Sequence, residues 1–348
     1  MPHSPSRIDG IDIARGLSML LVVIMHSTIG VEAASGRAEI FHRIVDFATG
    51  FRIPAFFLIS GLFFAKAMRF SLEELFRRRI FGLLALYLIW LVIHVTIRSI
   101  GPILTDPASG LIGKDGLLPE LLLGLIEPFG ALWFIYLLAV FALVGWLVRA
   151  MPGWLVVLLA AALESLRIQT GWTLIDEFCA RFVYFQLGLM VSPLLLPQRA
   201  AGDIVPSFVL KDIATRPVLP VLLLVVWGVV QSLLVVGGYD RWRIFSLLDG
   251  VIGAGALLLI GALVAQSLPL KGLKAFLLLM GRRSIVVYLV FTIPMALMRM
   301  MLLRFFPDLP LDLMVFIVVV AAIATALLLE RLSRRSRLIG RLFERPVL

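Results

Sequence analysis

The chain has few of the residues that build disulfide frameworks, metal clusters and soluble surfaces. Among its 348 residues there are only one cysteine and four histidines. The single cysteine, Cys179, excludes an internal disulfide framework and a cysteine-based metal cluster. Charged residues make up only 16% of the chain, whereas 61% of the residues are hydrophobic, a balance that soluble globular domains do not have. The composition therefore predicts an all-α polytopic membrane protein.

The motifs of nucleotide-binding and metal-dependent proteins are also absent from the sequence. There is no Walker-type phosphate loop, no Gly-rich dinucleotide fingerprint after a strand and no paired-histidine metal motif. The glycines between Gly250 and Gly261 are interpreted as a helix-packing face. The net charge of +10 is interpreted as basic residues that flank membrane spans and contact lipid head groups. We therefore expect membrane lipids as partners, and neither a metal nor a nucleic acid.

Long apolar runs predict about ten membrane spans, because each span needs about 20 mostly apolar residues. Residues 117–127 are apolar but bounded by prolines, and they predict an interfacial or re-entrant helix. The longest polar connection, 198–216, is too short for a second domain, so residues 1–348 are expected to form one integral-membrane domain. The spans are expected near 12–30, 45–66, 80–98, 131–149, 154–168, 178–197, 217–236, 247–268, 284–303 and 313–330.

The distribution of basic residues predicts the orientation of the chain. With both termini in the cytoplasm, about 20 basic residues lie inside and about nine lie outside. This asymmetry favours an N-in, C-in protein of the plasma (bacterial inner) membrane. The first apolar run also has features of a signal peptide, with small residues at 33–35. We expect it to be retained as a span, because it contains His26 near its end.

Three charged or titratable residues interrupt the first span. In DGIDIARGLSMLLVVIMHSTIG, residues 9–30, they are Asp12, Arg15 and His26. An α-helix places Arg15 and His26 within roughly 20° of one face and about 16 Å apart along the axis. A charged and titratable stripe is costly in lipid, so this face is expected to meet protein or a water-filled cavity.

The pattern Asp12-x-x-Arg15-Gly16, followed by His26, resembles the Arg-x10-His element of the integral-membrane acyltransferase-3 family. FRIPAFFLISGLFF, residues 51–64, resembles the family's second motif, in which an Arg or His is followed by Pro, two Phe and Ser-Gly. The resemblance covers nearly the whole chain. It implies the transfer of an acyl group from acyl-CoA, either acetyl-CoA or succinyl-CoA, to a hydroxyl of a cell-surface or lipid-linked carbohydrate.

Within the second motif, Arg52 has two interpretations. It is either an anchor at the outer interface or, as we prefer, a cation that points inward at the depth of His26. Pro54 is expected to kink or open the helix. Ser60 and Gly61 are expected to permit close helix approach, and Ser60 is also a candidate for substrate binding.

Three further segments resemble weaker family patterns. The fourth span opens with Leu132-Trp133-Phe134, and Trp133 and Tyr136 are expected to share a face, either in an aromatic belt or along the acceptor cavity. Tyr184 precedes a Leu-Gly pair, and Arg181 nearby is interpreted as interfacial. The resemblance implies substrate binding by Trp133, Tyr136, Ser60, Tyr184, Ser284 and Tyr288.

The ninth span departs from the family pattern. Gly281 to Leu289 resembles the segment Gly-x-x-Ser-x-x-x-Tyr, which supplies Ser284 and Tyr288. Many relatives have a histidine about three residues after the tyrosine, where this chain has Phe291. His26 is therefore expected to have no histidine partner there. His94, in the third span, is expected to make an interhelical hydrogen bond.

Acyl transfer to a sugar hydroxyl needs a base, and it needs positive charge or hydrogen-bond donors near the developing oxyanion. His26 is the candidate for the base or for a transient acyl carrier, and the sequence leaves both open. Arg15, near the cytoplasmic end, suits the pyrophosphate of coenzyme A. Asp12 either orients Arg15 or orders the helix start. Arg52 is the candidate cation for the oxyanion or for a sugar oxygen.

Two other functions fit the same composition and spacing. A transporter or flippase of a sugar or lipid-linked intermediate also needs many spans, a charged core and helices broken by proline. A non-enzymatic membrane assembly factor is the third possibility. The preference for an acyltransferase rests on the family resemblance alone.

Overall fold

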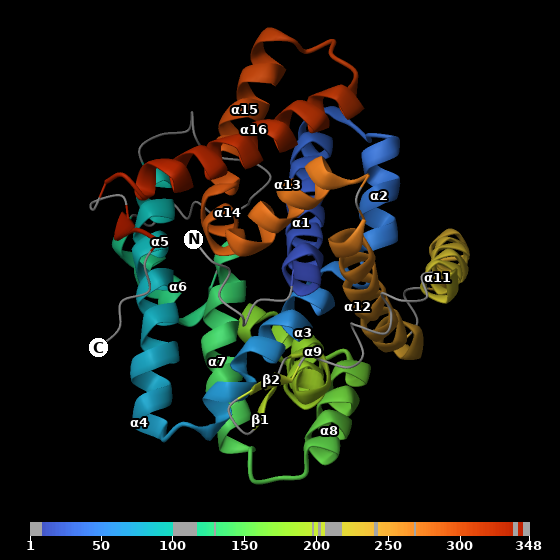
Figure 1. Cartoon of the computed structure of the whole chain (residues 1–348). Coiled ribbons are helices and arrows are strands. Elements are labelled where there is room, and N and C mark those ends of the chain that lie inside the picture. The colour runs from blue at the N-terminus through green and yellow to red at the C-terminus, as the bar shows by residue number, and fades with distance from the viewer. Residues whose placement is uncertain are drawn as a thin grey trace.

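The structure is a computed structural model and is almost entirely helical, which confirms the expected all-α membrane class (Figure 1). A short antiparallel hairpin, β1 (Gln198–Ala200) and β2 (Asp203–Val205), supplies the only strands in the part of the chain described here. The rest of the polar connection 198–216 lies outside that part. The described residues are 9–99, 117–128, 130–196, 198–200, 203–205, 218–239, 243–267, 269–336 and 340–343.

Within the described residues, seven helical segments are long and apolar enough to cross a membrane, and up to nine if each of two bent helix pairs forms one span. The fifth expected span, 154–168, corresponds to α8, which is apolar but has only 14 residues. The number of spans and their orientation stay predictions. The helices are α1 (Asp9–Ser35), α2 (Ile40–Ala48), α3 (Arg52–Phe64), η1 (Ala65–Arg69), α4 (Leu72–Leu75), η2 (Phe76–Ile80), α5 (Phe81–Ser99), α6 (Leu117–Ile126), η4 (Gly130–Leu132), α7 (Trp133–Leu147), α8 (Gly153–Leu166), α9 (Thr173–Leu195), α11 (Val218–Val236), α12 (Arg243–Gln266), α13 (Lys271–Arg282), α14 (Ser284–Val290), α15 (Thr292–Phe305) and α16 (Leu311–Ser333).

The second expected span is broken into α2 and α3, which meet at 47°. The break falls between Ala48 and Arg52, so the expectation of a kink at Pro54 is wrong in position. Pro54 lies in the first turn of α3, where backbone N–H groups have no partner within the helix and a proline costs little. Proline therefore helps to start α3 and does not bend it.

The chain around the ninth span also departs from the expected single helix. α14 and α15 meet at 47° near Phe291. Before them, residues expected to form a cytoplasmic connection form the separate helix α13, which packs along α1. Gly16 of α1 and Gly281 of α13 permit this contact, because a Cβ atom at either position would overlap the backbone of the other helix.

Glycines also set the other close helix contacts around α1 and α3. Gly10 and Gly261 bring α1 against α12, which agrees with the packing face expected between Gly250 and Gly261. Gly61 of α3 faces Gly188 of α9, and a Cβ atom at either would overlap a carbonyl of the other helix. The expected close approach at Gly61 is therefore confirmed. Figure 1 shows α1 in the middle of the bundle, between α12 and α14.

Candidate functional site

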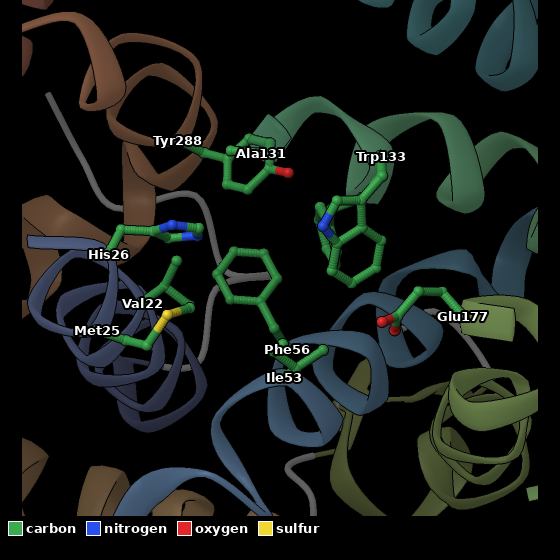
Figure 2. Close-up of a pocket in the computed structure, with 10 residues that line it drawn as sticks. Val22, Met25, His26, Ile53, Phe56, Ala131, Trp133, Glu177 and Tyr288 are labelled. Carbon is green, nitrogen blue, oxygen red and sulfur yellow. The ribbon is translucent and has the colours of Figure 1, made fainter. Parts of the chain in front are cut away.

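A cavity of about 230 Å³ lies beside His26, between α1, α3, α7, α9 and α14 (Figure 2). Five segments that are far apart in the sequence meet here. α1 and α3 contain the two main motifs found in the sequence, and α7 and α14 contain two of the weaker ones. The lining residues are Val22, Met25, His26, Ile53, Phe56, Ala131, Trp133, Phe134, Glu177 and Tyr288.

The wall of the cavity is mainly aromatic and aliphatic. Phe134 packs edge-on against Phe56, with ring centroids 4.8 Å apart, and its centroid lies 5.4 Å from that of Tyr288. The polar lining side chains are His26, Trp133, Glu177 and Tyr288. Such a site, apolar with a few convergent polar groups, is the usual form of a small-molecule site.

His26 packs against an aromatic ring instead of a second histidine. The centroid of the Phe291 ring lies 5.3 Å from that of His26. Phe291, three residues after Tyr288, is therefore an aromatic neighbour of the imidazole. His94 lies on α5 beside Trp90, with ring centroids 6.0 Å apart. Any imidazole chemistry in the cavity therefore depends on His26, which is the only histidine among the described lining residues.

Arg15 and His26 belong to one unbroken helix, as their spacing requires. The Arg15 guanidinium carbon lies 5.8 Å from the centroid of the Phe56 ring, and Phe56 also lines the His26 cavity. Both residues therefore face α3. Asp12 contacts the end of α13 through Arg282, whose Nε lies 3.4 Å from Asp12 Oδ2. This ion pair ties the first turn of α1 to α13.

Arg52 is buried beside the cavity but does not line it. Its Nη1 donates to Thr49 Oγ1 at 2.9 Å and to the Val45 carbonyl at 3.3 Å, so the cation lies at the C-terminal end of α2. The Ser18 hydroxyl donates to the Arg52 carbonyl at 2.7 Å. The next residue, Ile53, lines the cavity together with His26. The Arg52 backbone therefore lies next to the cavity wall, while its guanidinium bonds to the end of α2.

Four expected substrate-binding residues lie outside the cavity wall. Tyr136 donates to the Leu125 carbonyl at 3.2 Å and packs against Tyr87, so it does not share the cavity with Trp133. Ser60 donates to the Phe56 carbonyl of its own helix at 2.8 Å. Tyr184 packs against Gly250, and Ser284 is buried. Trp133 and Tyr288 are the two members of the expected set that meet at His26.

Glu177, which is not among the residues expected at the site, points into the cavity from the second turn of α9 (Figure 2). Its Oε2 accepts from Arg181 Nε at 3.0 Å. The expected span began at 178 and so left this acid out. The sequence nevertheless carries a signal for this acid. Glu177 and Arg181 lie one helical turn apart in an apolar segment, and ionisable residues in such a segment mark a functional site by default.

Among the described residues, the site lacks a group of side chains that could ligate a metal ion. Within the described ranges, no group of three or more His, Cys, Asp or Glu side chains is arranged to hold one. Cys179 is buried and has a free thiol. The chemistry available at the cavity is that of one imidazole, one carboxylate, one phenol and one indole.

Comparison with known proteins supports the family resemblance. No curated protein and no solved structure matches the chain. The family model described as an acyltransferase domain, that of the acyltransferase-3 family, matches residues 8–331, which include the whole cavity. The chain therefore belongs to the acyltransferase-3 family and is a multi-pass membrane acyltransferase that acts on a carbohydrate-type acceptor.

Proposed function

We propose that the chain transfers an acetyl or succinyl group from acyl-CoA to a hydroxyl of a cell-surface or lipid-linked carbohydrate. The single observation that best supports this is the cavity in which His26 meets Trp133 and Tyr288. Three separate family motifs supply these residues. An imidazole among apolar walls is suited to proton transfer, and an indole is suited to the apolar face of a sugar ring.

Two routes are consistent with this set of groups. In the first, His26 takes the proton of the sugar hydroxyl while the sugar oxygen bonds to the acyl carbon, the C–S bond breaks, and the proton passes to the CoA thiolate. In the second, an imidazole nitrogen bonds to the acyl carbon as the C–S bond breaks and the CoA thiolate leaves. The sugar oxygen then bonds to the acyl carbon as the C–N bond breaks, and the hydroxyl proton passes to the CoA thiolate. In both routes the Tyr288 hydroxyl and the Arg52 charge are the proposed stabilisers of the oxyanion.

The proposed donor path follows α1. Arg15 and His26 are about 16 Å apart on one helix face, a distance comparable to an extended pantetheine arm. The nucleotide end of coenzyme A would stay near Arg15 at the cytoplasmic mouth, while the arm presents the thioester to His26. This arrangement avoids the large cost of placing phosphate charge within the membrane.

The proposal is tested in cells and with purified protein. Deletion of the gene is expected to remove acetyl or succinyl esters from the envelope glycan, and wild-type protein should restore them. Purified protein should transfer the acyl group from labelled acyl-CoA to glycan isolated from the deletion strain. An unchanged ester content, together with no transfer by the purified protein, would reject the function.

A further inference from the structure

Glu177 and His26 lie at opposite ends of the cavity; the Phe56 ring lies between them, and the Trp133 indole lies on the Glu177 side (Figure 2). The Glu177 carboxylate is turned toward the cavity, and its side chain is 29% exposed. Glu177 lies near the start of α9, and Trp133 begins α7. In the expected orientation both of these helix ends are on the outer side, so the carboxylate lies at the outer mouth.

A structural role as the counter-ion of Arg181 does not account for this position. Arg181 Nε donates to Oε2 of Glu177, which leaves Oε1 able to accept a hydrogen bond from a ligand. The surface pair of Glu74 with Arg78 has the same (i, i+4) spacing and lies outside the cavity. An (i, i+4) ion pair therefore forms without a cavity beside it, and pairing with Arg181 alone does not explain why Glu177 faces the cavity.

We propose that Trp133 and Glu177 form the acceptor subsite and select the sugar that is acylated. The sugar ring stacks on the indole, ring hydroxyls donate to the Glu177 carboxylate, and the hydroxyl to be acylated lies at the His26 end. This inference rests on the proposed function and adds the chemical class of the acceptor unit: a sugar that is uncharged or bears an ammonium group. A uronic or other acidic sugar is disfavoured, because its carboxylate would meet that of Glu177.

The size of the cavity fits one sugar unit. Its volume of about 230 Å³ lies below the range of roughly 300–1,000 Å³ that is typical of sites for drug-sized ligands. The rest of a glycan chain or of a lipid carrier would then extend out of the cavity past Glu177. Selection at this subsite therefore concerns the single sugar residue that receives the acyl group.

The test compares purified wild-type protein with the Glu177→Gln variant, which keeps the shape of the side chain and removes its charge. The probe acceptor is envelope glycan isolated from cells that lack this protein, and the donor is labelled acetyl-CoA or succinyl-CoA. The Glu74→Gln variant is the matched control, because it breaks an ion pair of equal spacing outside the cavity. The sugar that becomes esterified is identified by NMR of the product.

We expect Glu177→Gln to raise the apparent KM for the glycan about fivefold, because a charge-assisted hydrogen bond becomes a neutral one. The KM for acyl-CoA should be unchanged in this variant, both KM values should be unchanged in Glu74→Gln, and the ester should lie on a neutral or amino sugar.

Each contrary result has a defined meaning. If wild-type protein transfers nothing to the glycan, the proposed function itself fails. If wild-type protein is active, the inference is overturned by a glycan KM that stays within twofold in Glu177→Gln, or by an equal loss of donor and acceptor affinity. An ester found on an acidic sugar overturns it too, and that result does not depend on whether the variant folds.

Discussion

At the scale of the residue, His26 has an apolar neighbour on one side and polar groups across the cavity. Phe291 packs against the imidazole and offers it no proton, whereas Tyr288 and Glu177 share the cavity wall with it. Proton transfer at this site therefore cannot pass to a second histidine within the described cavity. This makes His26 the residue whose loss is expected to have the largest effect.

The His26→Ala variant is expected to lose acyl transfer almost completely, while expression and membrane insertion stay normal. The reason is that alanine can neither take a proton nor hold an acyl group. Transfer of labelled acyl groups by purified protein measures the effect, and detergent-solubilised yield is the control. Full activity in this variant would remove His26 from both proposed routes.

The Arg52→Lys variant is expected to lose much of the activity even though it keeps the charge. Arg52 is buried and bonds to Thr49 and Val45 through Nη1, and a lysine ammonium is more strongly hydrated than the guanidinium and so costs more to bury there. Thr49→Val is the control, since it removes one partner of Arg52 and leaves the charge in place. Equal activity with lysine and arginine would show that Arg52 supplies only charge or an anchor.

The Arg15→Ala and His26→Ala variants are expected to affect different steps. Arg15→Ala should weaken acyl-CoA binding more than it slows turnover at saturation, because it removes a phosphate partner. His26→Ala should slow turnover and leave donor binding nearly intact. Equilibrium binding of acyl-CoA to each variant distinguishes an effect on donor binding from an effect on turnover. Unchanged affinity in Arg15→Ala would reject the donor path along α1.

At the scale of the element, the crossing of α3 and α9 sets the spacing of two walls of the cavity. Gly61 and Gly188 let the two helices touch through their backbones. α3 supplies Ile53 and Phe56 to the wall, and α9 supplies Glu177. Any change in the separation of these helices therefore changes the distance across the cavity.

The Gly61→Ala variant is expected to lower the free energy of unfolding by about 1–3 kcal/mol, because the added methyl group would overlap the Phe185 carbonyl. Gly255→Ala on α12 is the matched control. A Cβ atom at Gly255 meets nothing within 4 Å, so alanine there should be neutral or slightly stabilising, through its higher helix propensity. Thermal unfolding in detergent compares the two variants, and equal stabilities would argue against the close crossing.

At the scale of the whole molecule, orientation in the membrane decides which substrate meets which end of the site. Reporter fusions at Leu348 are expected to report a cytoplasmic C-terminus, because the basic residues are concentrated on that side. Internal fusions after Ser35 should report the opposite side. An extracytoplasmic signal at Leu348 would break the ten-span arrangement and, with it, the outer location proposed for Glu177.

The membrane class, the helical content, the family and the shared face of Arg15 and His26 followed from the sequence by itself. These are local properties, because the length of an apolar run and the period of a helix can be counted along a short stretch. The resemblance of three separate segments to family motifs then pointed to His26, Trp133 and Tyr288, which the folded chain brings to one cavity.

Only the tertiary structure decided where the helices break and which polar side chains meet. The bend before Pro54, the separate helix α13 and the contact of Phe291 with His26 depend on packing between distant segments. The same holds for Arg52, whose guanidinium lies at the end of α2 outside the cavity wall, and for Glu177, which faces His26 across it. Periodicity assigns a residue to a face, but the neighbouring helices determine what that face meets.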